Sequence, residues 1–185
     1  MSSIDSIKTN LAKLFQAPST GTEGDSEVVS EEILNKLNAL AAEVRLATIS
    51  SIYSVNSGHV STSLSMVDII TALLFHKMNW QELISNVKGK SEKEQWQYWQ
   101  DPTLSRDRFV LSKGHGVPSW YAACAVAGYI QPEELNQLRV INSRLQGHPE
   151  RQRFPFIDGT TGSLGQGQSV ALGYALAKKK QGSNN

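Results

Sequence analysis

The chain lacks the features that mark several large classes of protein. Its 185 residues include one cysteine, Cys124, so no internal disulfide can form and an oxidised, secreted scaffold is not expected. No apolar run approaches the roughly 20 residues that a membrane-spanning helix needs. The first residues contain no basic region followed by an apolar stretch, as a secretory signal would. We therefore expect a cytoplasmic protein with no membrane partner.

An excess of charge of one sign is also missing. The chain has 18 Lys and Arg against 17 Asp and Glu, a net charge of +1. This balance argues against a protein that binds nucleic acid through a broad basic face. The length suits one ordinary domain with a hydrophobic core and is too short for two large domains.

Residues 1–29 have the composition of a flexible N-terminal tail. A short amphipathic pattern precedes a linker over residues 17–26 that is rich in Ser, Thr and Gly. The pattern is typical of a docking helix for a partner protein, or of a leader with one transient helix, and we favour the leader. Its apolar residues are Ile4, Ile7, Leu11, Leu14 and Phe15.

Helical signals dominate from Ser30 onward. Ser30 can cap a helix whose first turn is acidic, and apolar residues then recur at helical spacing until a turn near residues 56–58. A second helix is predicted after Ser65, with Ser65 and Asp68 as a capping box. Further helices are expected over residues 118–127, from Pro132, and from about Gln166 to Lys180.

Two features between residues 79 and 112 complete the predicted layout. Residues 79–102 are interpreted as a partly helical, Trp-rich insertion on the surface. Its tryptophans, Trp80, Trp96 and Trp99, would form a local cluster or a partner contact, and we favour the cluster. The run from Arg108 to Ser112 predicts one buried strand. The predicted fold class is therefore α/β, predominantly helical in this chain.

Three of the four histidines directly follow a glycine and lie in loops between helical segments. They are His59, His115 and His148, whereas His76 ends an apolar helix and is interpreted as structural. Imidazole can exchange a proton near pH 7, and imidazolium can bind phosphate. A single loop histidine is more often a capping or packing residue, but the recurrence of Gly-His is harder to assign to chance.

A glycine-rich loop over residues 159–167 leads into the last predicted helix. Such a loop presents free N–H groups and the positive end of a helix dipole to an anion or a carbonyl. Its spacing matches neither a P-loop nor a dinucleotide-binding fingerprint. A flexible turn with a helix cap is an equally good interpretation of the composition alone.

The order of these motifs resembles one known family. SGH, SLS, DRFVLSKGHG, LQGHPE and TTGSLGQG follow each other as in the N-terminal half of transketolase, especially its split, two-chain bacterial versions. The resemblance covers residues 31–180, interrupted by the Trp-rich insertion. It implies that residues 30–185 are an incomplete N-terminal domain with a partial thiamine-diphosphate-binding fold.

The resemblance also implies an activity and site residues. The reaction would be transfer of a two-carbon ketol unit from a ketose phosphate to an aldose, with thiamine diphosphate as cofactor. His115 would lie against the cofactor near its phosphates, and His59 and His148 would line the sugar channel and assist proton transfer. Backbone atoms of the glycine-rich loop would contact the cofactor at Gly162, Ser163 and Leu164.

The sequence departs from the family pattern in two places, and both departures affect the activity that we expect of this chain. Val60 to Thr62 follow His59 where the family usually has a Gly- or Pro-rich stretch. The chain also stops at Asn185, before the GDG-type acidic motif that binds Mg²⁺ in the family, so we expect no metal ligands within it. The glutamate that activates the cofactor belongs to the family's other half.

We therefore expect a transketolase subunit or fragment, C-terminally truncated relative to the family pattern and inactive alone. Its partners would be complementary transketolase chains, in an oligomer, that supply the GDG motif and the pyrimidine-binding half. Two alternatives stay open: a non-catalytic remnant or helical interaction module, and a small-molecule phosphate binder that uses His115 without catalysis.

Overall fold

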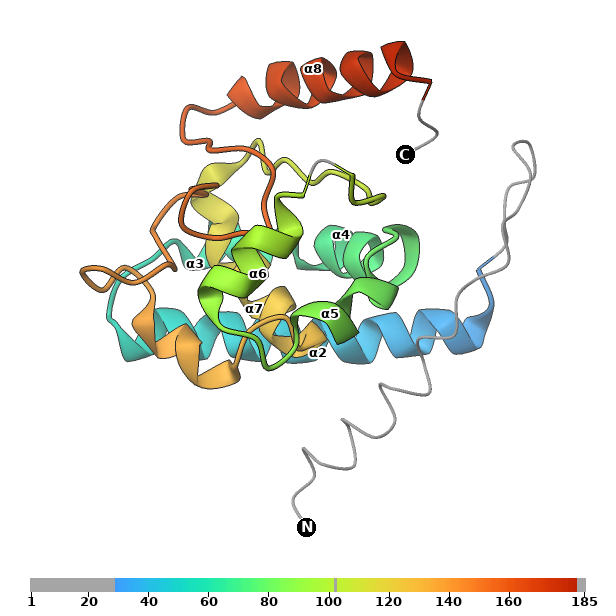
Figure 1. Cartoon of the computed structure of the whole chain (residues 1–185). Helices are drawn as coiled ribbons and strands as arrows, with labels where there is room; N and C mark the ends of the chain where they lie inside the picture. Colours follow the sequence, from blue (N-terminus) through green and yellow to red (C-terminus); the bar gives the residue numbers. More distant parts are fainter. Residues whose placement is uncertain (1–28, 102, 183–185) are drawn as a thin grey trace.

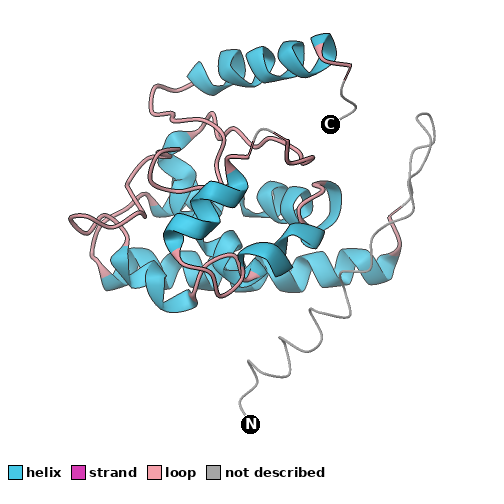
Figure 2. Ribbon diagram, viewed as in Figure 1, coloured by secondary structure: helices cyan, strands magenta, loops and turns pink. Residues whose placement is uncertain are grey.

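The computed structural model describes residues 29–101 and 103–182, so the predicted N-terminal tail, Val29 apart, lies outside the described residues. The described part is helical, and it contains no β-strand (Figure 2). Figure 1 shows the long helix α2 along one side of the molecule and α8 on the opposite side. In chain order the elements are α2 (Glu31–Ser54), α3 (Val60–Leu64), α4 (Val67–Ala72), the π-helix η1 (Leu73–Lys77), the 3₁₀ helix η2 (Gln81–Leu83), α5 (Ile84–Val87), α6 (Glu92–Trp99), the 3₁₀ helix η3 (Gly114–Gly116), α7 (Val117–Ala127), the 3₁₀ helix η4 (Pro132–Gln137) and α8 (Gln166–Lys180).

Helix α2 begins where the sequence predicts it. The Ser30 hydroxyl accepts a hydrogen bond from the backbone N–H of Ile33, and the acidic first turn lies at the positive end of the helix dipole. The helix ends at Ser54, just before the predicted turn. Its inner face packs on α7 and α4 through Leu40, Ala41, Val44, Thr48, Ser51 and Ile52.

The predicted capping box of Ser65 and Asp68 is wrong. Ser65 ends the short helix α3, and its hydroxyl donates to the backbone carbonyl of Thr62. Helix α4 begins at Val67 without a side-chain cap. Asp68 instead forms an ion pair with Arg45 of α2, because the packing of α2 on α4 brings a guanidinium within reach of its carboxylate.

The tryptophans of residues 79–102 do not lie together on the surface. Trp80 and Trp99 are both 0% exposed, and their rings pack edge to face with centroids 4.6 Å apart. Trp96 is exposed and does not join them. The prediction of a surface segment is wrong for the two buried rings, because folding places their large apolar area against Trp120 and Tyr129 of the core.

Residues 108–112 do not form the predicted strand. The backbone carbonyl of Phe109 accepts a hydrogen bond from the Asp158 N–H at 2.8 Å, and the Phe109 N–H donates to the Asp158 carboxylate instead of to a backbone carbonyl. A strand needs a repeated ladder with a neighbouring strand. The described residues supply no such neighbour, so this segment is a buried extended loop.

Helix α7 is the centre of the core. Every residue from Val117 to Ala125 is buried, with Pro118 in the first turn. Gly128 ends the helix in the left-handed conformation, with φ of +86°, as the sequence predicts for a glycine at this place. The predicted helix that Pro132 opens is present as the 3₁₀ helix η4.

Helix α8 has the predicted bounds and the predicted lysines at its negative end. Only Gly167 of this helix is fully buried, whereas Leu172 and Leu176 are 60% and 59% exposed. Within the described ranges, no helix is long and apolar enough to cross a membrane.

Candidate functional site

The three Gly-His loops meet at one place. The ring centroids of His59 and His115 lie 5.0 Å apart, and those of His115 and His148 lie 4.8 Å apart. Both pairs pack edge to face, with His115 in the middle. Since the three residues come from loops far apart in the sequence, the fold and not the local pattern assembles this histidine cluster.

His115 is held by tight packing of the glycines on either side. A Cβ on Gly116 would lie 2.3 Å from the Met66 sulfur, and a Cβ on Gly114 would lie 3.1 Å from the Thr161 carbonyl oxygen. No side chain fits at Gly116 without a shift of Met66. The glycines therefore allow the His115 loop to approach α4 and the glycine-rich loop closely.

Beside His115, a lysine adds a positive charge. The Lys113 ammonium donates a hydrogen bond of 2.6 Å to the Ser65 hydroxyl. Ser65 is exposed and Lys113 is half-buried, so the ammonium lies at the edge of the site. Lys113 and three imidazoles make this region suited to an anionic ligand.

The three histidines differ in exposure, since His59 is exposed whereas His115 and His148 are half-buried. His59 is exposed and precedes α3, where its side chain makes no capping hydrogen bond. His148 is half-buried. Burial first, and then the nearby charges of His115, Arg139 and His59, lower the pKa of His148 below its ordinary value. His148 is thus held toward the neutral form, which can accept a proton.

The glycine-rich loop joins this cluster at its first residues. The Thr161 hydroxyl donates to the Leu111 backbone carbonyl, and the Thr161 N–H donates to the Pro149 carbonyl. A Cβ on Gly162 would lie 3.7 Å from the His148 ring, so Gly162 borders the cluster. Ser163 and Leu164 are exposed, and the structure gives neither side chain a contact with the histidines.

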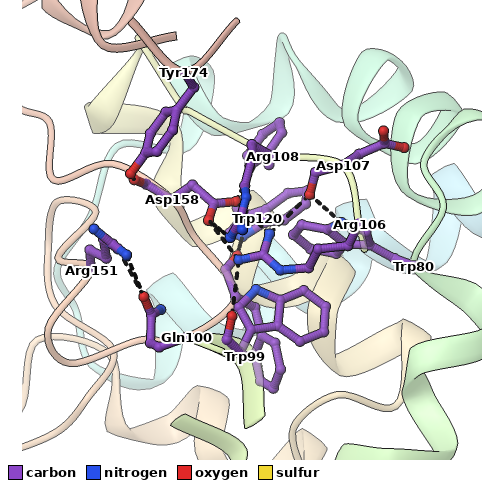
Figure 3. A network of polar contacts seen from close by, with 12 residues as sticks. Trp80, Trp99, Gln100, Arg106, Asp107, Arg108, Trp120, Arg151, Asp158 and Tyr174 are labelled. Carbon is purple, nitrogen blue, oxygen red and sulfur yellow. Dashed lines mark hydrogen bonds and ion pairs between the residues drawn. The ribbon is translucent and has the colours of Figure 1, made fainter. Parts of the chain in front are cut away.

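A buried ion pair beneath the site was not predicted from the sequence (Figure 3). Arg106 and Asp158 have 0% exposed side chains and share two short hydrogen bonds, of 2.7 and 2.8 Å. Arg106 precedes the DRFVLSKGHG motif, and Asp158 precedes the glycine-rich loop. The only signal in the sequence was two charged residues flanking apolar runs, which surface residues share.

The side chains described at this site are three imidazoles and one ammonium group. Among the described residues, no group of three or more His, Cys, Asp or Glu side chains could hold a metal. His59, His115 and His148 do lie together, with neighbouring rings packed edge to face. The cluster can bind hydroxyls or phosphate oxygens and can exchange protons.

Comparison with known proteins identifies the family. The family described as "Transketolase, thiamine diphosphate binding domain" matches residues 36–184. The chain therefore belongs to the transketolase family and corresponds to its thiamine-diphosphate-binding domain, which confirms the resemblance found in the sequence.

Individual relatives agree with this assignment. The chain is 37% identical over 150 residues to the transketolase of Homo sapiens, covering 80% of this chain and 21% of that protein. It is 36% identical over 143 residues to the transketolase of Treponema pallidum, covering 77% and 19%. The chain thus spans about a fifth of the length of the curated relatives it matches.

Solved transketolases also resemble the structure. The transketolase from Leishmania mexicana matches with a TM-score of 0.61 and 32% identity, over 77% of this chain and 19% of that one. A mutant, R525L, of the enzyme from Pichia stipitis matches with a TM-score of 0.60 and 33% identity, over 77% and 18%. These neighbours have the predicted α/β thiamine-diphosphate-binding fold, although the predicted strand is not found in the described residues.

Proposed function

We propose that this chain forms one face of a thiamine-diphosphate site and takes part in transfer of a two-carbon ketol unit from a ketose phosphate to an aldose. The observation that carries the proposal is the meeting of His59, His115 and His148 beside Gly162. The family description names thiamine diphosphate as the ligand of this domain. Transketolase is the name of the relatives that match it.

The residues present fit one side of this cofactor. Gly114 and Gly116 leave no room for a Cβ, which brings the backbone of the His115 loop against its neighbours. His115 and Lys113 would hold the negatively charged diphosphate, and the backbone of Gly162, Ser163 and Leu164 would border the aminopyrimidine. Once bound, the cofactor supplies the electron sink that cleavage of a carbon–carbon bond needs.

His59 and His148 are the proposed catalytic residues. His59 is exposed and His148 is half-buried, so a sugar hydroxyl could reach both side chains. The lowered pKa of His148 suits it to accept a proton from a hydroxyl near neutral pH. His115 lies between them and would orient both rings.

The second side of the site is proposed to come from complementary transketolase chains in an oligomer. The described residues hold no candidate metal group, and the diphosphate needs a cation such as Mg²⁺. We infer that a partner with the acidic metal motif and the pyrimidine-binding half completes the site in the cytoplasm. The isolated chain is then inactive.

Calorimetry with thiamine diphosphate and Mg²⁺ tests this proposal. We expect no micromolar binding by the chain alone, and micromolar binding with ketol transfer once a complementary transketolase chain is added. His59→Ala and His148→Ala should each lower turnover of that mixture by about 10²-fold or more, as expected for loss of a proton-transfer group.

The matched control is His76→Gln, which changes the histidine outside the cluster and should leave turnover near wild type. Micromolar binding by the isolated chain would contradict the need for a partner. Full turnover of the two alanine variants would contradict the sugar-channel roles.

A second candidate is a helical interaction module of transketolase ancestry without catalysis. The exposed Leu172 and Leu176, one turn apart on α8, favour it, because neighbouring exposed apolar side chains can be covered by a partner. This alternative predicts that a partner binds α8 equally well in the His59→Ala and His148→Ala variants and in the absence of thiamine diphosphate.

A further inference from the structure

Asp158 lies at the start of the glycine-rich loop and makes polar contacts with two separate parts of the chain, residues 106–109 and helix α8 (Figure 3). Its carboxylate accepts two hydrogen bonds from the Arg106 guanidinium and a third, of 2.8 Å, from the Phe109 N–H. The Arg108 guanidinium lies 3.3 Å from the same carboxylate. Asp158 thus ties the start of the glycine-rich loop to the segment that leads into the His115 loop.

Arg106 is fixed as firmly as the carboxylate it binds. Its guanidinium donates to the backbone carbonyls of Trp99 and Asp107, and its Cζ lies 4.6 Å from the centre of the Trp99 ring and 5.7 Å from that of Trp80. A guanidinium held by a fork of two bonds and by aromatic faces has one orientation. The Arg106–Asp158 pair therefore fixes the relative positions of the two segments that carry these residues, and its two buried charges neutralise each other.

The backbone of Asp158 extends this contact to α8. The Tyr174 hydroxyl donates a hydrogen bond of 2.8 Å to the Asp158 carbonyl oxygen. Tyr174 lies on the stripe of α8 that also carries Gly167 and Val170, and these two contact Ser112 and Gly159. The glycine-rich loop is consequently held at both ends: by the Asp158 carboxylate at its start, and by the α8 stripe at its finish.

The loop fixed in this way is the one that borders the histidines. Two residues after Gly159, Thr161 bonds to Leu111 and Pro149, and its carbonyl oxygen would lie 3.1 Å from a Cβ on Gly114. The next residue, Gly162, borders His148. A shift of Asp158 would therefore move the loop relative to His115 and His148, because only short, directly bonded segments separate them.

We propose that Asp158 is a positioning residue, which together with Arg106 and Tyr174 sets the spacing between the glycine-rich loop and the His115–His148 pair. Its side chain is fully buried, so it would act through the loop and not by contact with a bound cofactor or sugar. The inference deepens the proposed function, because the geometry it maintains is that of the thiamine-diphosphate face. It also predicts an effect on the histidines themselves, whether or not a cofactor binds.

Two variants test the positioning role in the full chain. The Arg106→Gln/Asp158→Asn double variant removes the two fully buried charges together, so that only Arg108, whose side chain is 17% exposed, loses an ion-pair partner. Tyr174→Phe removes only the hydroxyl that reaches the Asp158 carbonyl, on a half-buried side chain. The matched control is Tyr98→Phe, which removes a hydroxyl that accepts a bond from Asn86 on the exposed surface away from the site.

The first readout is the NMR titration of the imidazole signals of His115 and His148. The second is the affinity for thiamine diphosphate and Mg²⁺ in the presence of a complementary transketolase chain. We expect both histidine signals to shift in the double variant and in Tyr174→Phe but not in Tyr98→Phe. The dissociation constant should rise about tenfold or more in the double variant, and less in Tyr174→Phe.

Histidine signals and affinity that match wild type in a folded double variant would overturn the proposal and leave the pair a purely stabilising role. If the double variant does not fold, Tyr174→Phe decides the question, since wild-type signals there would equally refute it. If wild type fails to bind the cofactor while the histidine signals still move, the proposed function fails and the positioning role stands.

Discussion

Helices α7 and α8 both follow a loop of the candidate site, yet their environments are opposite. Helix α7 follows the His115 loop and is buried over most of its length, whereas α8 follows the glycine-rich loop and buries a single residue fully. Figure 1 shows α8 set apart from the remaining helices. One loop of the site is therefore anchored to the core, and the other depends on a narrow stripe of α8 and on Asp158.

The difference in burial between α7 and α8 indicates where a partner chain could contact this protein and complete the site. The anchored side holds the His115 loop in place, because Gly114 and Gly116 on either side of His115 pack closely against Thr161 and Met66. The α8 side keeps Leu172 and Leu176 exposed, so a protein that covered this face would bury additional apolar area. We expect rearrangement on partner binding to occur in α8 and not in α7.

The largest effect should come from Trp120→Ala in α7. Trp120 is fully buried, stacks on Phe109 with centroids 3.8 Å apart, and donates a hydrogen bond to the Phe156 carbonyl. We expect a loss of about 3–5 kcal/mol in the free energy of unfolding, measured by urea denaturation. Trp96→Ala is the control and should cost far less, because Trp96 is exposed. Equal losses would show that α7 is not the core of the fold.

The attachment of α8 can be broken by a single methyl group. A Cβ on Gly167 would lie 2.5 Å from the Ser112 Cα, whereas a Cβ on Gly173 of the same helix would meet nothing within 4 Å. Gly167→Ala should lower the free energy of unfolding by about 1–3 kcal/mol through overpacking. Gly173→Ala should instead raise it by up to about 1 kcal/mol, through helix propensity.

Thermal unfolding measures both changes, and limited proteolysis reports whether α8 detaches. If α8 resists proteolysis in Gly167→Ala as well as it does in wild type, the inferred contact between Gly167 and Ser112 is contradicted.

The pH dependence of the free energy of unfolding should report the lowered pKa of His148 in the histidine cluster. The lowered pKa of His148 means that the unfolded chain binds more protons than the folded one, between the unfolded value near 6.5 and the lower folded value. Stability should therefore fall as the pH drops through this window and be fully present above it. His148→Gln should flatten that part of the profile, as measured by chemical denaturation from pH 5 to 8.

His115→Gln should raise the pKa of His148 only part of the way, because burial is the largest cause of the shift and the charge of His115 comes second. NMR titration measures the change. A His148 pKa that returns fully to its ordinary value would show that repulsion within the cluster outweighs burial.

The smallest effect on stability should come from the outer face of α8. Replacing Leu172 and Leu176 by Ser should change the free energy of unfolding by only about 0.5 kcal/mol per site, because both side chains are largely exposed. The same change should reduce self-association at high concentration, as measured by light scattering. A large loss of stability would mean that this face is already covered within the folded chain.

Helices and motifs could be predicted from the sequence because their signals are local. The cap at Ser30, the proline in the first turn of α7 and the terminal Gly128 act within one or two turns of helix. The Gly-His loops and the glycine-rich loop are likewise visible as short patterns. Their order along the chain is specific enough to indicate the family.

The failures share one physical cause, which is competition from partners distant in the sequence. Asp68 binds Arg45 of α2 in place of a cap, and Phe109 bonds to Asp158 in place of a neighbouring strand. Trp80 and Trp99 are drawn into the core, although their segment is polar overall. Each outcome depends on contacts across tens of residues, which local periodicity does not contain.

By itself, the sequence determined where α2, α7 and α8 lie, which loops carry histidine and glycine, and the family to which the chain belongs. The tertiary structure alone brought the rings of His59, His115 and His148 into one cluster, and buried the Arg106–Asp158 pair next to the glycine-rich loop. The reason is that helix caps and turns are set by neighbouring residues. Convergence of loops and burial of charge, in contrast, are set by the packing of the whole chain.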